Sequence, residues 1–199
     1  MPVMPGSYSV SLSMVTREGT TELVRDVPFK AVSLNLATLP AENRGAVDEF
    51  NSRVSELAGT MAAAQDFAGE LHQKAVIIRQ TLHDMGGAYP EMMKRAAALE
   101  KRVEDVQFKF DGPEPKASWE EVPPGPMPLN RRLRAVIYGS LASSSGTTQT
   151  QKDNYRILKD ELPPVLEELK AINTEITQLN KELDEMDAPW TPGRIPELQ

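Results

Sequence analysis

Adjacent carboxylates are the side chains in this sequence best suited to acid–base chemistry. They occur as Glu120-Glu121, Glu167-Glu168 and Asp184-Glu185. Glycoside hydrolysis uses two such groups on either side of one bond. The second and third pairs, however, lie in a heptad pattern, off its apolar positions and near Lys170 or Lys181, where charged residues are typical of a solvated helix face. Since nothing in the sequence forms a cleft around any pair, we predict no catalytic residues.

Histidine is the other residue type that could support chemistry, and the sequence contains only His72 and His83. Their separation places them on similar faces of one helix, but about 16 Å apart along its axis. Neither has a second histidine or a cysteine four positions away with which to share a metal ion. We therefore predict flanking or solvated histidines, no metal site and no cofactor.

Three further motifs have simple structural interpretations. The "SSSG" motif at 143–146 lacks the lysine and the glycine spacing of a phosphate loop, so it predicts a connector between helices. The arginines of "NRRLR" at 130–134 are expected to pair with neighbouring helices rather than with nucleic acid. Trp119 and Trp190 lie in proline-rich segments, where a large aromatic ring anchors a loop or contacts another domain. Trp190, with Arg194, is the better interface candidate.

Composition narrows the choice of partners. The 199 residues carry a formal net charge of -7, which disfavours nucleic acid and anionic membranes as partners. There is no cysteine, so disulfides and thiol chemistry are excluded. No run of about 18 apolar residues predicts a membrane span, and the N-terminus lacks the pattern of a signal peptide. Aromatic residues make up only 6%, a bias typical of helices packed by aliphatic side chains.

The N-terminal segment predicts a β-hairpin. Tyr8, Val10, Leu12 and Met14 alternate with serines, which is the period-2 pattern of a half-buried strand. A second strand, "ELVRDVPFKAV", follows the polar "TREGTTE" turn. Because a two-stranded hairpin is marginally stable in water by itself, we expect these strands to belong to a larger sheet whose other strands this sequence does not contain.

Beyond residue 40 the apolar period changes to spacings of three and four, which is a heptad pattern. It predicts a first helix that begins near Pro40 and ends at Gly86-Gly87, with Gly59 allowing a neighbouring helix to approach closely. A last helix begins at a Thr148–Gln151 capping box and is expected to bend at Pro163-Pro164. Two shorter helices are predicted between them, over about 90–108 and 128–141.

These lengths predict a mainly α fold. Two long helices and a middle rod, interrupted by a proline-rich loop, give an elongated antiparallel three-helix bundle with a short N-terminal hairpin. A four-helix arrangement at one end of the molecule is the alternative. The two differ in the position of the C-terminal tail, which lies far from the hairpin only in the three-helix arrangement.

Four motifs in order carry a family resemblance: "PGSYSVSL", "VPFKAV", "PLNRRLRAVIYGSLASSSGTTQTQKDNYRIL" and "LNKELDEMDAPWTPGRIPEL". They resemble the C-terminal region of large bacterial proteins described as glycosyl hydrolases with BNR repeats, or as sortilin-type β-propeller proteins. In that family a propeller and a β-sandwich precede the helical region, and the whole is exported. The resemblance implies a periplasmic or extracellular protein. Any glycosidase activity would then belong to the propeller, whose Asp-box repeats are absent here.

We therefore expect three regions: a hairpin at 1–37, the end of a truncated Ig-like sandwich; a helical bundle at 38–187; and a proline-rich tail at 188–199. The expected function is that of a non-catalytic accessory module that packs on the propeller and sandwich of the same protein or forms a homo-oligomer. The alternatives are a stand-alone coiled-coil adaptor and part of a glycosidase site. The residues expected at the interface are Tyr8, Val10, Leu12, Trp190 and Arg194.

Overall fold

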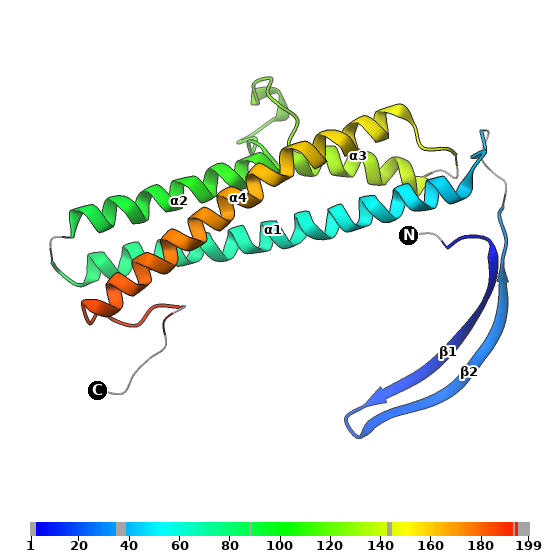
Figure 1. Ribbon diagram of the computed structural model, residues 1–199, viewed down its shortest axis with the longest axis horizontal. Helices are drawn as coiled ribbons and strands as arrows, with labels where there is room; N and C mark the ends of the chain where they lie inside the picture. The colour runs from blue at the N-terminus through cyan, green and yellow to red at the C-terminus, as the bar shows by residue number, and fades with distance from the viewer. Residues whose placement is uncertain (1–2, 35–38, 88, 143–144, 193, 195–199) are drawn as a thin grey trace.

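The fold is a long helical bundle with a β-hairpin at one end, as the computed structural model in Figure 1 shows. It describes residues 3–34, 39–87, 89–142, 145–192 and 194. The elements along the chain are β1 (Gly6–Thr16), β2 (Gly19–Ala31), α1 (Arg44–Asp84), α2 (Pro90–Asp111), the short 3-10 turn η1 (Trp119–Glu121), α3 (Leu129–Ala142) and α4 (Gln149–Glu185).

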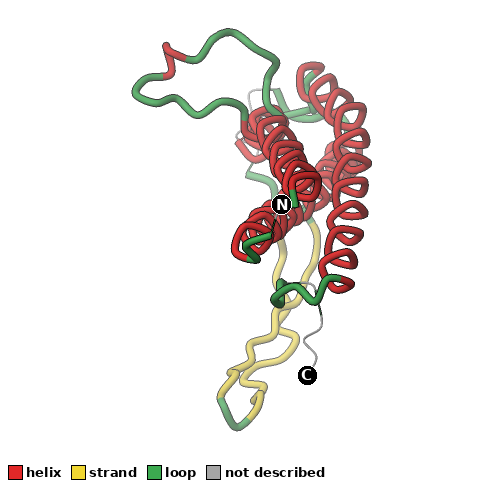
Figure 2. Tube along the Cα trace, turned by 90° about the vertical axis from the view of Figure 1, so that its left-hand side faces the viewer, coloured by secondary structure: helices red, strands yellow, loops and turns green. Residues whose placement is uncertain are grey.

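The helices form three antiparallel rods. α1 and α4 run along the bundle, while α2 and α3 follow one another end to end and together make the middle rod (Figure 1). The proline-rich loop between α2 and α3 projects from the side of this rod (Figure 2). The prediction of an elongated three-helix bundle with an interrupted middle helix is therefore confirmed.

The heptad positions make the core. Nine residues of α1 are buried, and they follow the predicted spacing of three and four, with one step of seven between Val54 and Met61. In α4 the apolar positions of the same heptad seam are buried from Leu158 to Leu183. Between them pack Ala96, Leu99, Val103, Val106 and Phe110 of α2. A smaller cluster of Phe50, Val54 and Val136 closes the end nearest the hairpin, where the Phe50 and Tyr155 rings meet edge to face at 5.5 Å.

Helix boundaries follow local hydrogen bonds. The Thr148–Gln151 capping box is present, with Gln151 N–H donating to Thr148 Oγ1 at 3.2 Å. α1 instead begins at Arg44, later than predicted, because Asn43 Oδ1 accepts from Ala46 N–H at 3.0 Å and caps the helix there. Pro40 lies outside the helix and forms an isolated bridge with Ser145. α4 continues through Pro163 and Pro164 as one helix.

The proline-rich loop is closed at its base. Asn130 Nδ2 donates to Asp111 Oδ1 at 2.7 Å, which joins the end of α2 to the start of α3. Gly112, at the junction, has a φ of 74°, and a Cβ there would lie 2.5 Å from Pro128 Cγ. Only glycine suits this position, because both the backbone conformation and the close proline exclude a side chain. The chain therefore leaves the middle rod at Gly112 and returns to it at the start of α3.

Ion pairs fix the register of α2 against α4. Arg102 Nε and Nη1 reach Glu168 and Glu175 at 2.7 and 2.6 Å. Arg95 makes a bidentate contact with Glu182, at 2.6 and 3.0 Å. Hydrogen bonds from the guanidinium hold the pKa of the Glu182 carboxyl below its usual value, and the same contact raises the pKa of Arg95.

Glu182→Gln should lower stability in a pH-dependent way. A carboxyl whose pKa is lower in the folded state stabilises that state above its unfolded pKa, and this contribution is lost as the pH falls through the folded value. We expect the wild type to be more stable than Glu182→Gln by up to about 1 kcal/mol above roughly pH 5, because both partners are partly solvent-exposed. Denaturant unfolding at several pH values should show this difference shrinking on acidification, whereas Glu185→Gln, at an exposed site on the same helix, should show none.

Candidate docking surface

The hairpin carries one continuous apolar face. β1 and β2 are antiparallel, and their paired residues include Tyr8 with Phe29, Val10 with Val27, and Leu12 with Val24. Directly paired residues project to the same side of a sheet, and alternate residues of a strand share that side. Seven large apolar side chains lie on this side, and we call them the apolar hairpin face: Tyr8, Val10, Leu12, Met14, Val24, Val27 and Phe29.

Two β-bulges in β2 keep this face apolar. The register shifts between Val10 and Leu12, and again between Leu12 and Ser13. Without the first shift Arg25 would pair with Leu12; with it, Val24 does. Asp26 adopts a positive φ of 51° at this bulge, and its N–H donates to Ser11 Oγ at 3.0 Å. The bulges thus keep the charges of Arg25 and Glu22 out of the apolar hairpin face.

No other part of the described chain covers this face. The hairpin projects away from the helices in both views (Figures 1 and 2), and within the described residues neither strand contacts a helix. Six of the seven residues are 43 to 58% exposed. Tyr8 is partly buried, because its ring stacks on Phe29 at 5.7 Å and its hydroxyl donates to the Met4 carbonyl at 2.6 Å. Contiguous exposed apolar surfaces are typical of sites at which proteins contact one another.

The opposite side of the hairpin is mainly polar. It presents Ser7, Ser9 and Ser13 from β1, paired with Lys30, Pro28 and Glu22 of β2, and Val15 is its exposed apolar exception. The two sides therefore differ sharply in chemistry, as they do in a sheet that packs on a core through one side only. The three hairpin residues expected at an interface lie on the apolar side, with Val10 and Leu12 open to solvent. Their role at an interface stays a prediction.

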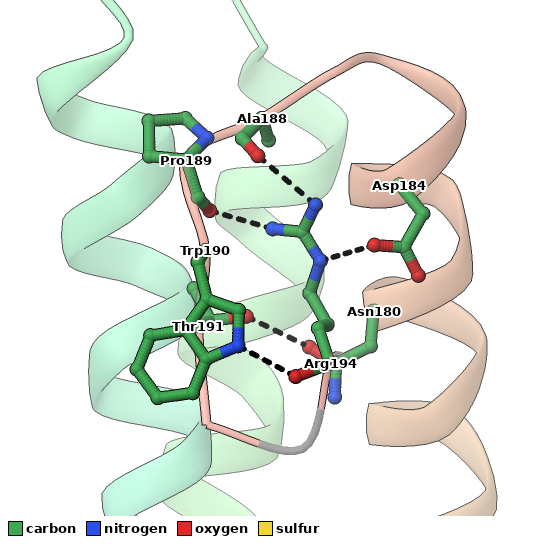
Figure 3. A network of polar contacts seen from close by, with 7 residues as sticks. All are labelled: Asn180, Asp184, Ala188, Pro189, Trp190, Thr191 and Arg194. Atoms are coloured by element: carbon green, nitrogen blue, oxygen red, sulfur yellow. Dashed lines mark hydrogen bonds and ion pairs between the residues drawn. The ribbon is translucent and has the colours of Figure 1, made fainter. Parts of the chain in front are cut away.

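The other predicted interface residues lie in the C-terminal tail, which folds back beside the end of α4 (Figure 3). The Arg194 side chain is only 7% exposed. Its guanidinium pairs with Asp184 and donates to the carbonyls of Pro189 and Ala188 at 2.6 and 3.0 Å. Trp190 Nε1 donates to the Arg194 carbonyl at 2.6 Å, while 57% of Trp190 stays exposed. Arg194 thus holds the tail, and the Trp190 ring is the group available to a partner.

The hairpin and the tail form two separate surfaces. They lie at opposite ends of the bundle (Figure 1), as the three-helix arrangement requires. The apolar hairpin face has seven side chains, whereas the tail offers one exposed aromatic ring, that of Trp190. We take the apolar hairpin face as the candidate docking surface.

The acid pair Glu167-Glu168 is engaged in ordinary ion pairs. Glu167 pairs with Lys170 at 2.6 Å, and Glu168 pairs with Arg102. An open cavity of about 260 Å³ lies beside the tail, and the one carboxylate among its lining residues is Asp184, the partner of Arg194. This cavity therefore does not hold the two facing carboxylates that glycoside hydrolysis requires.

The two histidines have different surroundings. His83 is exposed, and its Nδ1 lies 3.3 Å from an Asp84 carboxylate oxygen on the same helix. His72 lies opposite α2, where Glu100 and Glu104 approach it. Residue spacing along one helix could not reveal this cluster, because its members come from two helices.

The fold and its exposed surface define the class of this protein: a mainly helical, elongated three-helix bundle that carries a projecting β-hairpin. In comparisons with protein-family models, with curated proteins and with solved structures, the chain matches none of them. No helix in the described parts of the chain is both long and apolar enough to cross a membrane.

Proposed function

We propose that this protein is a non-catalytic interaction module whose apolar hairpin face packs on the apolar face of a β-sheet in another domain. In line with the family resemblance, that domain is the sandwich next to the propeller of an exported protein. The observation that carries the proposal is the continuous row of exposed apolar side chains on a hairpin that contacts no described helix.

Sheet packing is the interaction that suits this surface best. Two sheets pack face to face at about 10 Å, with side chains from their inner sides interdigitating. Val10, Val27 and Phe29 are β-branched or aromatic residues, which favour a pleated, half-buried surface. Full burial of one such side chain contributes about 1.5–3 kcal/mol, so burial of several would stabilise a hairpin that is marginal by itself.

The coiled-coil adaptor is the second candidate, and it requires an uncovered apolar stripe along a long helix. In the described part of α1 and α4, the heptad seams face the other helices and are buried. The apolar side of each long helix thus already packs on other helices of the same chain. The element with an exposed apolar side is the hairpin.

A substitution test separates the two sides of the hairpin. We expect the isolated chain to self-associate with rising concentration, because the apolar hairpin face is open. Replacing Val10 and Leu12 together by threonine should keep the protein monomeric, since threonine retains β propensity but removes apolar surface. The matched control replaces Ser9 and Ser13 by threonine on the polar side and should behave as the wild type. Light scattering at several concentrations measures the mass.

A site-specific photo-crosslinker then identifies the occupant. It is placed at Val10, or at Ser9 as the control, in the protein expressed in its native cells. The proposal expects crosslinks from Val10, several times more abundant than from Ser9, to a strand peptide of a β-sandwich domain. The proposal is overturned if Val10 crosslinks to a helix or to the hairpin of a second copy, or if Val10 and Ser9 give equal amounts of crosslinked product. It is also overturned if light scattering gives the same mass for the Val10/Leu12 variant and for the wild type.

A further inference from the structure

A cluster of metal-ligating side chains lies between α1 and α2, away from the hairpin. His72 comes from α1, and Glu100 and Glu104 come from adjacent turns of α2. Each offers one ligand atom, and the three atoms lie within 4.8 Å of one another. The spacing of four residues between the two glutamates places both carboxylates on the same side of α2, facing the histidine.

The backbone below this cluster is fixed by the core. Leu71 and Ala75 flank His72 on the buried side of α1, and Leu99 and Val103 lie beside the glutamates on α2; all four are at most 1% exposed. The Cα positions that carry the three ligands therefore cannot drift apart. Ligand atoms bound to one tetrahedral zinc ion lie about 3.4 Å apart, so side-chain rotation alone would bring this cluster to the required geometry.

Two neighbouring cations contact the glutamates of this cluster. Arg79 contacts both carboxylate oxygens of Glu100, through Nε at 2.8 Å and through Nη2 at 3.3 Å, and so orients this carboxylate as outer partners of metal ligands do. Lys101 lies 3.5 Å from Glu104 but has a closer partner in Asp105, at 2.9 Å. Among the described residues, none hydrogen-bonds to the His72 ring. Two carboxylates and an unengaged imidazole thus converge on one point.

From this geometry we propose that His72, Glu100 and Glu104 bind a divalent zinc-type ion that bridges α1 and α2. One imidazole nitrogen with carboxylate oxygens suits Zn²⁺, which is bound by nitrogen and oxygen ligands. Ca²⁺ and Mg²⁺ prefer sites made of oxygen atoms alone. Three protein ligands leave a fourth position for water. The site is independent of the docking proposal, because it lies on the surface of the bundle between α1 and α2 and involves no hairpin residue.

Zinc titration of the metal-free chain tests this site, with a chromophoric chelator as competitor. The chain contains only two histidines, so His83→Ala is a matched control: it removes an exposed histidine of the same helix that has Asp84 beside it. We expect one zinc ion per chain, affinity at least tenfold weaker in His72→Ala, and unchanged affinity in His83→Ala. Zinc should also raise the melting temperature of the wild type, but not that of His72→Ala.

A second variant guards against a folding defect. Glu104→Gln keeps the size of the side chain, which is 47% exposed in the wild type. This variant should therefore preserve the circular dichroism spectrum, and it should weaken zinc binding about tenfold or more. Ca²⁺ at the same concentration should compete poorly. The proposal is overturned if no saturable binding occurs, if His83→Ala weakens binding as much as His72→Ala, or if Glu104→Gln binds zinc as the wild type does.

Discussion

Replacing Phe110 by alanine should cost about 3–5 kcal/mol of unfolding free energy. Phe110 is fully buried in the last turn of α2, within the main core between the long helices. Truncating it removes a large apolar side chain and leaves a cavity that the surrounding helices fill only in part. The same turn carries Asp111, which accepts a hydrogen bond from Asn130 of α3, so a shift of this turn would also disturb the junction between α2 and α3.

The same helix offers a matched control. Phe108 is 58% exposed, so Phe108→Ala should change stability by no more than about 0.5 kcal/mol. The unfolding free energies of the Phe110→Ala and Phe108→Ala variants are measured by guanidinium unfolding, monitored by circular dichroism. If Phe110→Ala does not fold, Phe110→Leu, which retains much of the buried volume, gives a smaller and measurable loss. Equal losses for the Phe108 and Phe110 variants would show that this turn does not pack as described.

The helical bundle could be predicted because the sequence patterns that specify it are short and recur along each helix. The heptad spacing along α1 and α4 identifies the buried side of each helix without knowledge of its partners. The Thr148–Gln151 capping box likewise lies within four residues. The start of α1 was predicted less well, since Pro40 is a typical first-turn residue but Asn43, closer to the helix, supplies the actual cap.

Features that depend on contacts between distant segments could not be predicted. The bulges in β2 follow from its pairing with β1, and the sequence of β2 alone does not reveal which residue faces Leu12. The approach of Glu100 to His72 likewise involves two different helices. Gly59 shows the reverse error: it suggested close helix packing, yet a Cβ there would meet nothing within 4 Å. Small residues permit close approach, but they do not specify where a neighbour lies.

Arg194→Met should release the C-terminal tail from α4. Methionine keeps much of the aliphatic length but removes all the donors, so Asp184 and the carbonyls of Ala188 and Pro189 lose their partner (Figure 3). Charge-assisted hydrogen bonds contribute about 1.5–3 kcal/mol; because the Asp184 side chain is 54% exposed, we expect a loss near the lower end of this range. The loss should appear as local opening of the tail rather than as unfolding of the bundle.

Trp190 reports this opening. Its indole N–H donates to the Arg194 carbonyl, so release of the tail should expose the ring further and increase its quenching by acrylamide. The measurement is made in a Trp119→Phe background, which leaves Trp190 as the one tryptophan of the chain. Arg156→Met is the matched control, since Arg156 lies exposed on α4 with a long contact to Asp153 at 3.8 Å; it should leave the quenching unchanged.

Arg194→Lys separates charge from geometry. Lysine retains the positive charge but not the planar fork with which arginine reaches a carboxylate and two carbonyls at once. If the fork holds the tail, the lysine variant should behave almost as the methionine variant does. If lysine restores the wild-type quenching, attraction to Asp184 alone is sufficient. If even the methionine variant keeps the wild-type quenching, the tail is held by the burial of Ala188 and Thr191, and the hydrogen bonds of Arg194 only follow from that packing.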